Sequence, residues 1–261
     1  MLSFFGGGTG AVELPAHNCV QPTALQTPSL KKLYGKRVVL ASASRRRRDI
    51  LKTFGIEPEI VPSTFEETLS FDEFPDPHEY PVSTATHKAV EVYERLVREN
   101  PDDAPDLVIS ADTVVLTHPL PGLSSVPRFS DEPPPPQDLL EKPADKADNL
   151  RMLLDLNGGV CEVVTGVTLV WPVLEAPGYK LKSIEERTLV YFQENDEALL
   201  KAYVENGEGA DRAGGFAIQG LGGVLVSKIE GDYHNVVGFP AASFFKFLAL
   251  LVEEESDFLD L

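Results

Sequence analysis

Hydrophobic and polar positions follow two alternating periods along most of this chain. From residue 37 onward, short apolar runs typical of buried strands alternate with segments whose apolar positions recur every three or four residues. The runs predict strands at 37–41, 59–63, 106–116, 161–171 and 186–192, and the periodic segments predict helices at 48–54, 83–97, 145–157 and 196–206. Strands that alternate with helices predict an α/β layered fold.

The helix boundaries carry the usual start and stop signals. Asp145 is a candidate N-cap, and glycines at 55, 158 and 207 are candidate stops. Within the third helix, Ala147, Leu150 and Leu154 are predicted to form the inner face. In the second helix, that role falls to Ala85, Ala89, Val92 and Leu96.

The segments outside this pattern suggest the domain organisation. Residues 1–35 lack periodicity and predict a flexible extension, and residues 36–252 form the predicted domain. A Pro-rich insertion spans 118–140, and an acidic tail spans 253–261. The apolar segment 241–252 is too short to cross a membrane, so we expect a packed core helix or an oligomer face.

Charge and cysteine content exclude several functional classes. The chain has 261 residues, 43% of them hydrophobic, and a formal net charge of −18, which argues against coating nucleic acid or an anionic membrane. Its start lacks the basic residues of a secretory signal. The two cysteines form no disulfide framework and no zinc spacing, so we expect a reducing, cytoplasmic location.

Four consecutive arginines at 45–48 stand out in so acidic a chain. A predicted strand runs directly into Ser42, Ser44 and a helix start, where backbone N–H groups and the helix dipole attract anions. Arg46 and Arg47 carry planar guanidinium groups suited to phosphate. The alternatives are an ordinary helix capped by Ser42 or Ser44 with solvated arginines, or a nuclear-localisation patch.

Acidic residues supply a second group of candidates. Glu66 and Glu67 follow one predicted strand, and Asp112 marks the expected end of the central one. Near a phosphate site such carboxylates would hold Mg²⁺ or Mn²⁺, although they could also be solvated surface acids. Asp112 is the stronger candidate, because a carboxylate inside an apolar run is costly unless it is paired.

Three further side chains could contact the same ligand. Lys88 lies on a predicted helix, Lys142 lies in the sequence EKP, and Gln219 belongs to a Gly-rich run that could approach a base or phosphate closely. Each of the lysines, taken alone, would be read as a surface residue.

Taken together, these stretches resemble the Maf family of nucleoside triphosphate pyrophosphatases. The resemblance covers about residues 36–250 and rests on eight blocks in the family's order: LASAS with its arginines, the Glu pair, HKA, SADTVV, EKP, VVTGV, DRAGGFAIQG and KIEGDYHNVVGFP. It implies an elongated α/β fold of the Maf/ITPase type, in which a mixed, bent sheet with flanking helices forms two lobes around a nucleotide cleft.

The resemblance also implies an activity. Members hydrolyse nucleoside triphosphates between the α and β phosphates with a divalent metal, and the branch with AIQG favours dTTP and UTP. A homodimer is plausible, and we expect no nucleic-acid or membrane partner. The alternatives are a non-catalytic nucleotide-binding module and a nucleic-acid-contacting protein that uses the arginines at 45–48.

Site roles carry over from the family's motifs residue by residue. The implied catalytic residues are Asp112, Arg47, Lys142 and Glu67; the substrate-binding residues are Ser42, Arg46, Arg47, Lys88 and Gln219; and the metal ligands are Glu67 and Asp112. This chain departs from the family at Arg45 in place of proline, at Arg212 in place of lysine, and in its longer Pro-rich loop.

Overall fold

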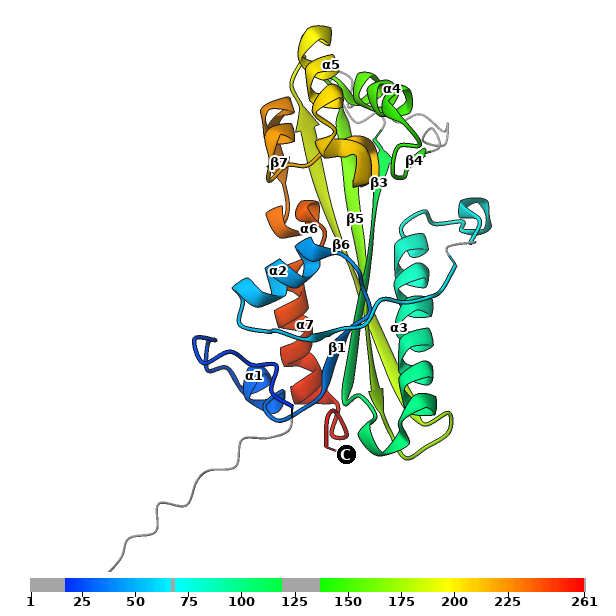
Figure 1. The fold of residues 1–261 in the computed structure, drawn as a ribbon, viewed down its shortest axis with the longest axis vertical. Helices are drawn as coiled ribbons and strands as arrows, with labels where there is room; N and C mark the ends of the chain where they lie inside the picture. Colours follow the sequence, from blue (N-terminus) through cyan, green and yellow to red (C-terminus); the bar gives the residue numbers. More distant parts are fainter. Residues whose placement is uncertain (1–16, 67–68, 119–136, 261) are drawn as a thin grey trace, which may run out of the picture.

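A computed structural model describes residues 17–66, 69–118 and 137–260. It contains a mixed sheet of seven strands in the order β2-β1-β3-β5-β6-β7, with β4 paired to β3. The strands are β1 (Val38–Leu40), β2 (Glu59–Ile60), β3 (Leu107–Thr117), β4 (Leu139–Leu140), β5 (Val160–Pro172), β6 (Tyr179–Phe192) and β7 (Val226–Glu230). Strand β1 is parallel to both neighbours and the remaining pairs are antiparallel. This elongated, mixed α/β architecture confirms the predicted fold class (Figure 1).

The helices divide between the two faces and the ends of this sheet. They are α1 (Pro28–Lys32), α2 (Arg45–Thr53), α3 (Glu79–Glu99), α4 (Lys146–Leu156), α5 (Glu197–Asn206), α6 (Tyr233–Val237) and α7 (Ala241–Glu254). Helix α3 lies along one face, α2 and α7 lie on the other, and α4 and α5 gather at one end of the long strands (Figure 1). Among the described residues, no helix is long and apolar enough to cross a membrane.

Side chains alternate along a strand, so the odd-numbered residues of β3 all lie on one face of the sheet. In β3, Ile109 packs with α2 and α7 in one hydrophobic cluster, whereas Val115 packs with α4 and α5 in a second one. Between them, the hydroxyls of Thr113 and Thr165 are hydrogen-bonded at 2.9 Å. The apolar interior on this face is therefore divided into two cores with a polar waist between them.

Close packing of α3 against β5 depends on Gly166. A Cβ atom at this position would lie 2.5 Å from the backbone of Val82 in α3, closer than any side chain permits. The inner face predicted for this helix (Ala85, Ala89, Val92 and Leu96) is buried as expected.

The predicted inner face of α4 is wrong. Ala147 and Leu154 are exposed, whereas the buried residues are Asn149, Met152, Leu153 and Leu156. Apolar residues cover more than half of this helix, so periodicity alone does not single out one face. Asn149 tolerates burial because its side-chain amide donates to the carbonyl of Gly215 at 2.9 Å.

The two terminal segments pack against the domain at several of their described residues. Leu30 and Leu33 belong to the same core as α7, and residue 20 forms a β-bridge with Ile56. In the acidic tail, Phe258 is buried and packs edge-on against Trp171, with ring centroids 5.2 Å apart. Scattered apolar anchors without a period hold both segments, which is why the pattern missed them. Residues 1–16 and most of the Pro-rich insertion lie outside the described residues.

Candidate functional site

Strand β3 has a gap along one edge. Strand β1 pairs with residues 107–109 of β3, and β4 pairs with residues 115 and 116. Within the described part of the chain, neither strand covers the stretch from Ser110 to Val114 on that edge. Asp112 therefore lies in the middle of β3, not at its end as we expected. A strand that lacks a neighbour along part of one edge can offer polar side chains to a ligand while the rest of the sheet stays paired.

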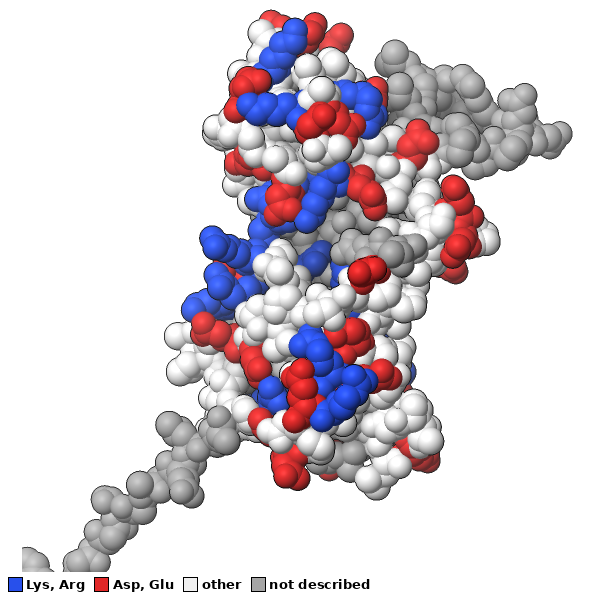
Figure 2. All heavy atoms as spheres, turned by 45° about the vertical axis from the view of Figure 1, so that its right-hand side comes forward, with Lys and Arg blue, Asp and Glu red and all other residues white. Residues whose placement is uncertain are grey.

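A cavity of about 860 Å³ lies at this gap. Its lining comes from the loop between β1 and α2, from α3, from β3, from the segment after β4, from the turns following α5, and from α6. Figure 2 shows Lys and Arg side chains gathered near the middle of the molecule, on a surface that is otherwise rich in acidic groups. The cavity brings together Ser42, Arg46, Arg47, Lys88, Asp112, Lys142 and Gln219.

The loop between β1 and α2 builds the first part of the site. Ser44 is the N-cap of α2, and its hydroxyl accepts from the backbone N–H of Arg47 at 3.5 Å. The hydroxyl of Ser42, which is buried, accepts from the backbone N–H of Ser44 at 3.2 Å. The serines thus leave the start of α2 facing the cavity, where a helix end favours an anion.

The two central arginines have different roles. The Arg47 guanidinium donates to the carbonyl of Gly238 at 2.9 Å, to the hydroxyl of Thr113 at 3.0 Å and to the hydroxyl of Ser42 at 3.2 Å. It therefore ties α2 to β3 and to the turn after α6. Arg46 is half-buried and lines the cavity, so it is the arginine better placed to meet a ligand.

A buried ion pair lies in the gap of β3. The ammonium of Lys88 on α3 donates to Asp112 at 2.9 Å, and the two side chains are only 12% and 14% exposed. A charge held so far from bulk water is stable only with a partner, so each residue fixes the other. The pairing of Lys88 with Asp112 is a contact that the sequence did not reveal.

The opposite side of the cavity is more exposed. Lys142 pairs with Asp211 at 2.7 Å, and these side chains are 67% and 73% exposed. Arg212 is more buried: its Nε atom is covered and has no hydrogen-bond partner among the described residues, and burial lowers the pKa of its guanidinium. Gln219 also lines this side.

Oxygen ligands for a metal are few among the described residues. Glu66 is exposed and does not line the cavity, and Glu67 lies outside the described residues. No group of three or more His, Cys, Asp or Glu side chains suited to a metal occurs in the described ranges. Mg²⁺ commonly takes one or two carboxylates together with substrate phosphates, and Asp112 fits that pattern.

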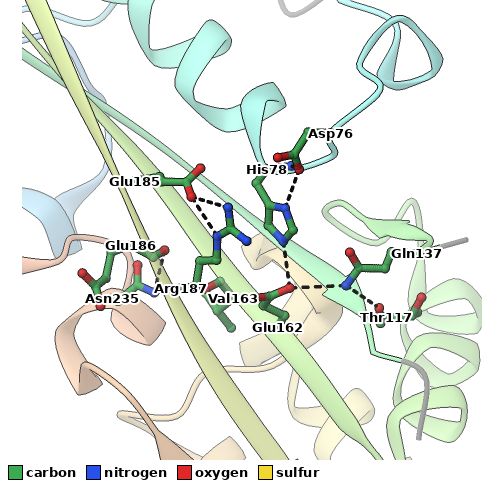
Figure 3. A network of polar contacts seen from close by, with 10 residues as sticks. All are labelled: Asp76, His78, Thr117, Gln137, Glu162, Val163, Glu185, Glu186, Arg187 and Asn235. Atoms are coloured by element: carbon green, nitrogen blue, oxygen red, sulfur yellow. Dashed lines mark hydrogen bonds and ion pairs between the residues drawn. The ribbon is translucent and has the colours of Figure 1, made fainter. Parts of the chain in front are cut away.

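Asn235, which holds α6 against the sheet, was not among the residues predicted from the sequence. The buried amide of Asn235 donates to the carbonyls of Val163 and Glu186 at 3.0 and 3.2 Å (Figure 3). It also donates to the hydroxyl of Thr188 at 3.0 Å. These bonds set the position of the turn at Gly238, which in turn receives Arg47. Its position inside the GDYHNVVG block was the feature of the sequence that could have pointed to this role.

Figure 3 also shows a separate polar network that does not line the cavity. His78, just before α3, contacts Glu162 at 2.9 Å and Asp76 at 2.5 Å, and Gln137 donates to Glu162 at 3.3 Å. These contacts join the start of α3 to β5 and support the fold around the site.

This chain is similar to known proteins along most of its length. The family described as Maf-like protein matches residues 37–251. The chain is 43% identical over 226 residues to a Homo sapiens protein named probable bifunctional dTTP/UTP pyrophosphatase/methyltransferase, covering 86% of this chain and 33% of that protein.

Two other relatives match along most of their own length. A dTTP/UTP pyrophosphatase of Schizosaccharomyces pombe is 36% identical over 236 residues, or 88% of this chain and 90% of the relative. One of Thermococcus kodakarensis is 39% identical over 203 residues, or 78% and 90%. With the family pattern spanning nearly the whole described fold and the cavity at its centre, the chain belongs to the Maf family.

Proposed function

We propose that this chain hydrolyses nucleoside triphosphates, dTTP and UTP in particular, to a nucleoside monophosphate and pyrophosphate. The observation that carries the proposal is the single cavity that joins the arginine-bearing start of α2 to the buried Lys88–Asp112 pair. The names of the relatives support the choice of substrate. We further propose that the protein acts on free nucleotides in the cytoplasm, and that it could do so as a homodimer.

The site would bind the triphosphate through its phosphates. The first residues of α2 line the cavity, and the positive end of a helix and the Arg46 guanidinium suit phosphate oxygens. Arg47 holds the loop that carries Ser42 in place. Because these groups are fixed before the ligand arrives, they stabilise developing charge without reorganising.

Asp112 would act as the base. It would orient a water molecule and take its proton as the water oxygen bonds to the α-phosphorus and the bond from that phosphorus to the bridging oxygen breaks. The electron pair would leave with pyrophosphate, whose charge Arg46 and Lys142 would stabilise. Lys88 would hold the Asp112 carboxylate in place through their ion pair.

A divalent cation, Mg²⁺ or Mn²⁺, would neutralise phosphate charge when bound. Asp112 and Glu67 are the residues that would hold it. Asp112 has the required hard oxygen atoms in the cavity, and Glu67 is the expected second carboxylate. Removal of the metal with a chelator should stop turnover, and restoring Mg²⁺ or Mn²⁺ should recover it.

The decisive experiment is a panel of pyrimidine and purine triphosphates with Mg²⁺ or Mn²⁺, scored for monophosphate and pyrophosphate. Pyrophosphate release that is fastest with dTTP or UTP is the expected result. Release of orthophosphate would mean that a different bond is broken. Tight nucleotide binding without any turnover would replace the enzyme with a non-catalytic binding module.

A further inference from the structure

The Gly-rich segment that carries Gln219 is anchored by two side chains, Tyr203 and Glu208, and Glu208 also lines the cavity. Three of its backbone N–H groups donate to side chains of α5 and the turn that follows. The N–H of Ala217 donates to the hydroxyl of Tyr203 at 3.0 Å. Those of Leu221 and Gly222 donate to the two carboxylate oxygens of Glu208 at 3.0 and 2.9 Å. Gln219 thus lies between fixed points on either side.

Steric contacts make the same arrangement specific. A Cβ atom on Gly220 would lie 2.0 Å from a carboxylate oxygen of Glu208, and one on Gly222 would lie 2.8 Å from the backbone of Ala217. The glycines therefore allow the segment to close tightly onto Glu208. With these close contacts, the backbone next to Gln219 has little room to move.

Tyr203, one of the two side chains that anchor the segment, is itself buried. Tyr203 is 5% exposed, and burial, together with the nearby Glu208 carboxylate, raises the pKa of its hydroxyl. The hydroxyl stays neutral and accepts the N–H of Ala217. Both carboxylate oxygens of Glu208 accept a backbone N–H of the segment, so this side chain holds the segment in place.

We propose that Glu208 is a positioning residue for base selection: it places the amide of Gln219 against the nucleotide base. This inference rests on the proposed function. An amide offers one donor and one acceptor, the same pair that the edge of uracil or thymine requires, whereas cytosine reverses the order. Discrimination of this kind depends on accurate placement, because a misplaced amide leaves polar groups unpaired.

The test compares kcat/KM for UTP, dTTP and CTP in the wild type, Glu208→Ala and Glu208→Gln. We expect the ratio of UTP to CTP to fall roughly tenfold in Glu208→Ala. Glu208→Gln retains one acceptor oxygen and should fall in between. Glu205→Gln is the matched control, because Glu205 lies near the end of α5, just before the turn that carries Glu208, is exposed and pairs only with Lys146 among the described residues. Its ratio should not change.

A double-mutant cycle separates positioning from general support. If Glu208 acts through Gln219, then Glu208→Ala should change the ratio less than twofold in a Gln219→Ala background. An equal loss for all three triphosphates, or an undiminished effect without Gln219, would overturn the proposal. Thermal unfolding checks each variant, and Glu208→Gln supplies the readout should Glu208→Ala not fold.

The two proposals fail in distinguishable ways. A wild type that cleaves no triphosphate contradicts the proposed function. The same variants are then compared by the ratio of nucleotide dissociation constants, where an unchanged UTP to CTP ratio in Glu208→Ala contradicts the positioning role.

Discussion

The two walls of the cavity are built on opposite principles. The inner wall is formed by Ser42, Arg46, Arg47, Lys88, Asp112 and Thr113. Its charged groups Arg47, Lys88 and Asp112 are largely buried and bonded to the protein. The outer wall, formed by Glu141, Lys142 and residues 207–222, contains an ion pair that is about five times more exposed than the Lys88–Asp112 pair. The outer wall is positioned through its backbone N–H groups.

Each wall stands on its own hydrophobic core. The loop and helix of the inner wall pack on the cluster that contains Leu51 and Phe244, and the outer wall packs on the cluster that contains Leu153 and Leu200. The difference suggests a division of work. A fixed, desolvated wall suits chemistry, because preorganised charges act strongly there. A wall held by its backbone suits recognition of a ligand that varies.

The largest expected effect follows Asp112→Asn on the inner wall. Loss of the base should reduce kcat about 10³-fold for every triphosphate. Asparagine keeps the shape and one acceptor for Lys88, so the fold should persist. Steady-state pyrophosphate release measures the rate, circular dichroism checks the fold, and the exposed Asp155→Asn is the control. A near-normal rate would remove Asp112 from the mechanism.

Arg47→Ala should have the next largest effect. It removes three hydrogen bonds that join α2, β3 and the turn at Gly238, so we expect roughly a 10²-fold loss of kcat/KM and a stability loss of about 1–3 kcal/mol. Urea unfolding and kinetics measure both quantities. Arg48→Ala, next in sequence but exposed, should change neither by much. Equal effects of the two variants would contradict the distinct role of Arg47.

A third prediction concerns the segment at Ser63, which also lines the cavity. Partial burial alone would raise the pKa of Glu91, but hydrogen bonds from Arg95, Ser63 and Thr64 outweigh it and lower the pKa to about 2. The ionised form therefore stabilises the fold above the ordinary value of 4.5, and this contribution is lost as the pH falls through about 2.

Glu91→Gln should consequently cost roughly 1–3 kcal/mol at pH 7. The difference from the wild type should shrink steadily when the pH falls from about 5 toward 2. Urea unfolding at a series of pH values measures it. A difference that stays constant with pH would show that Glu91 contributes by shape and not by charge.

The smallest effect on stability is expected for Lys142→Ala on the outer wall. Its exposed ion pair with Asp211 should contribute less than about 1 kcal/mol. Because we propose that the Lys142 ammonium stabilises the leaving pyrophosphate, kcat/KM should nevertheless fall about tenfold. Lys146→Ala, an exposed lysine paired with Glu205, is the control. A large loss of stability would show that Lys142 contributes as the buried charges of the inner wall do, and would contradict the contrast between the two walls.

Much of the fold could be predicted, because each long strand and helix repeats its pattern several times. The second helix and the central strand were found correctly for this reason. The predicted inner face of α4 was wrong, since Leu150 and Leu154 compete with Leu153 and Leu156, and both pairs have a spacing that fits one face of a helix. The roles assigned to the site residues stay predictions, although the cavity gathers all of them that lie within the described residues.

The order of residues along the chain is enough to predict the α/β class, the serine-capped start of α2 and the types of residue available for chemistry, because each of these depends on local sequence. Which of those groups meet depends on the tertiary structure. Lys88 and Asp112 are 24 residues apart, and Arg47 and Gly238 are 191 apart. Such pairs arise where strands leave a gap and helices cross it, and no local pattern encodes that distance.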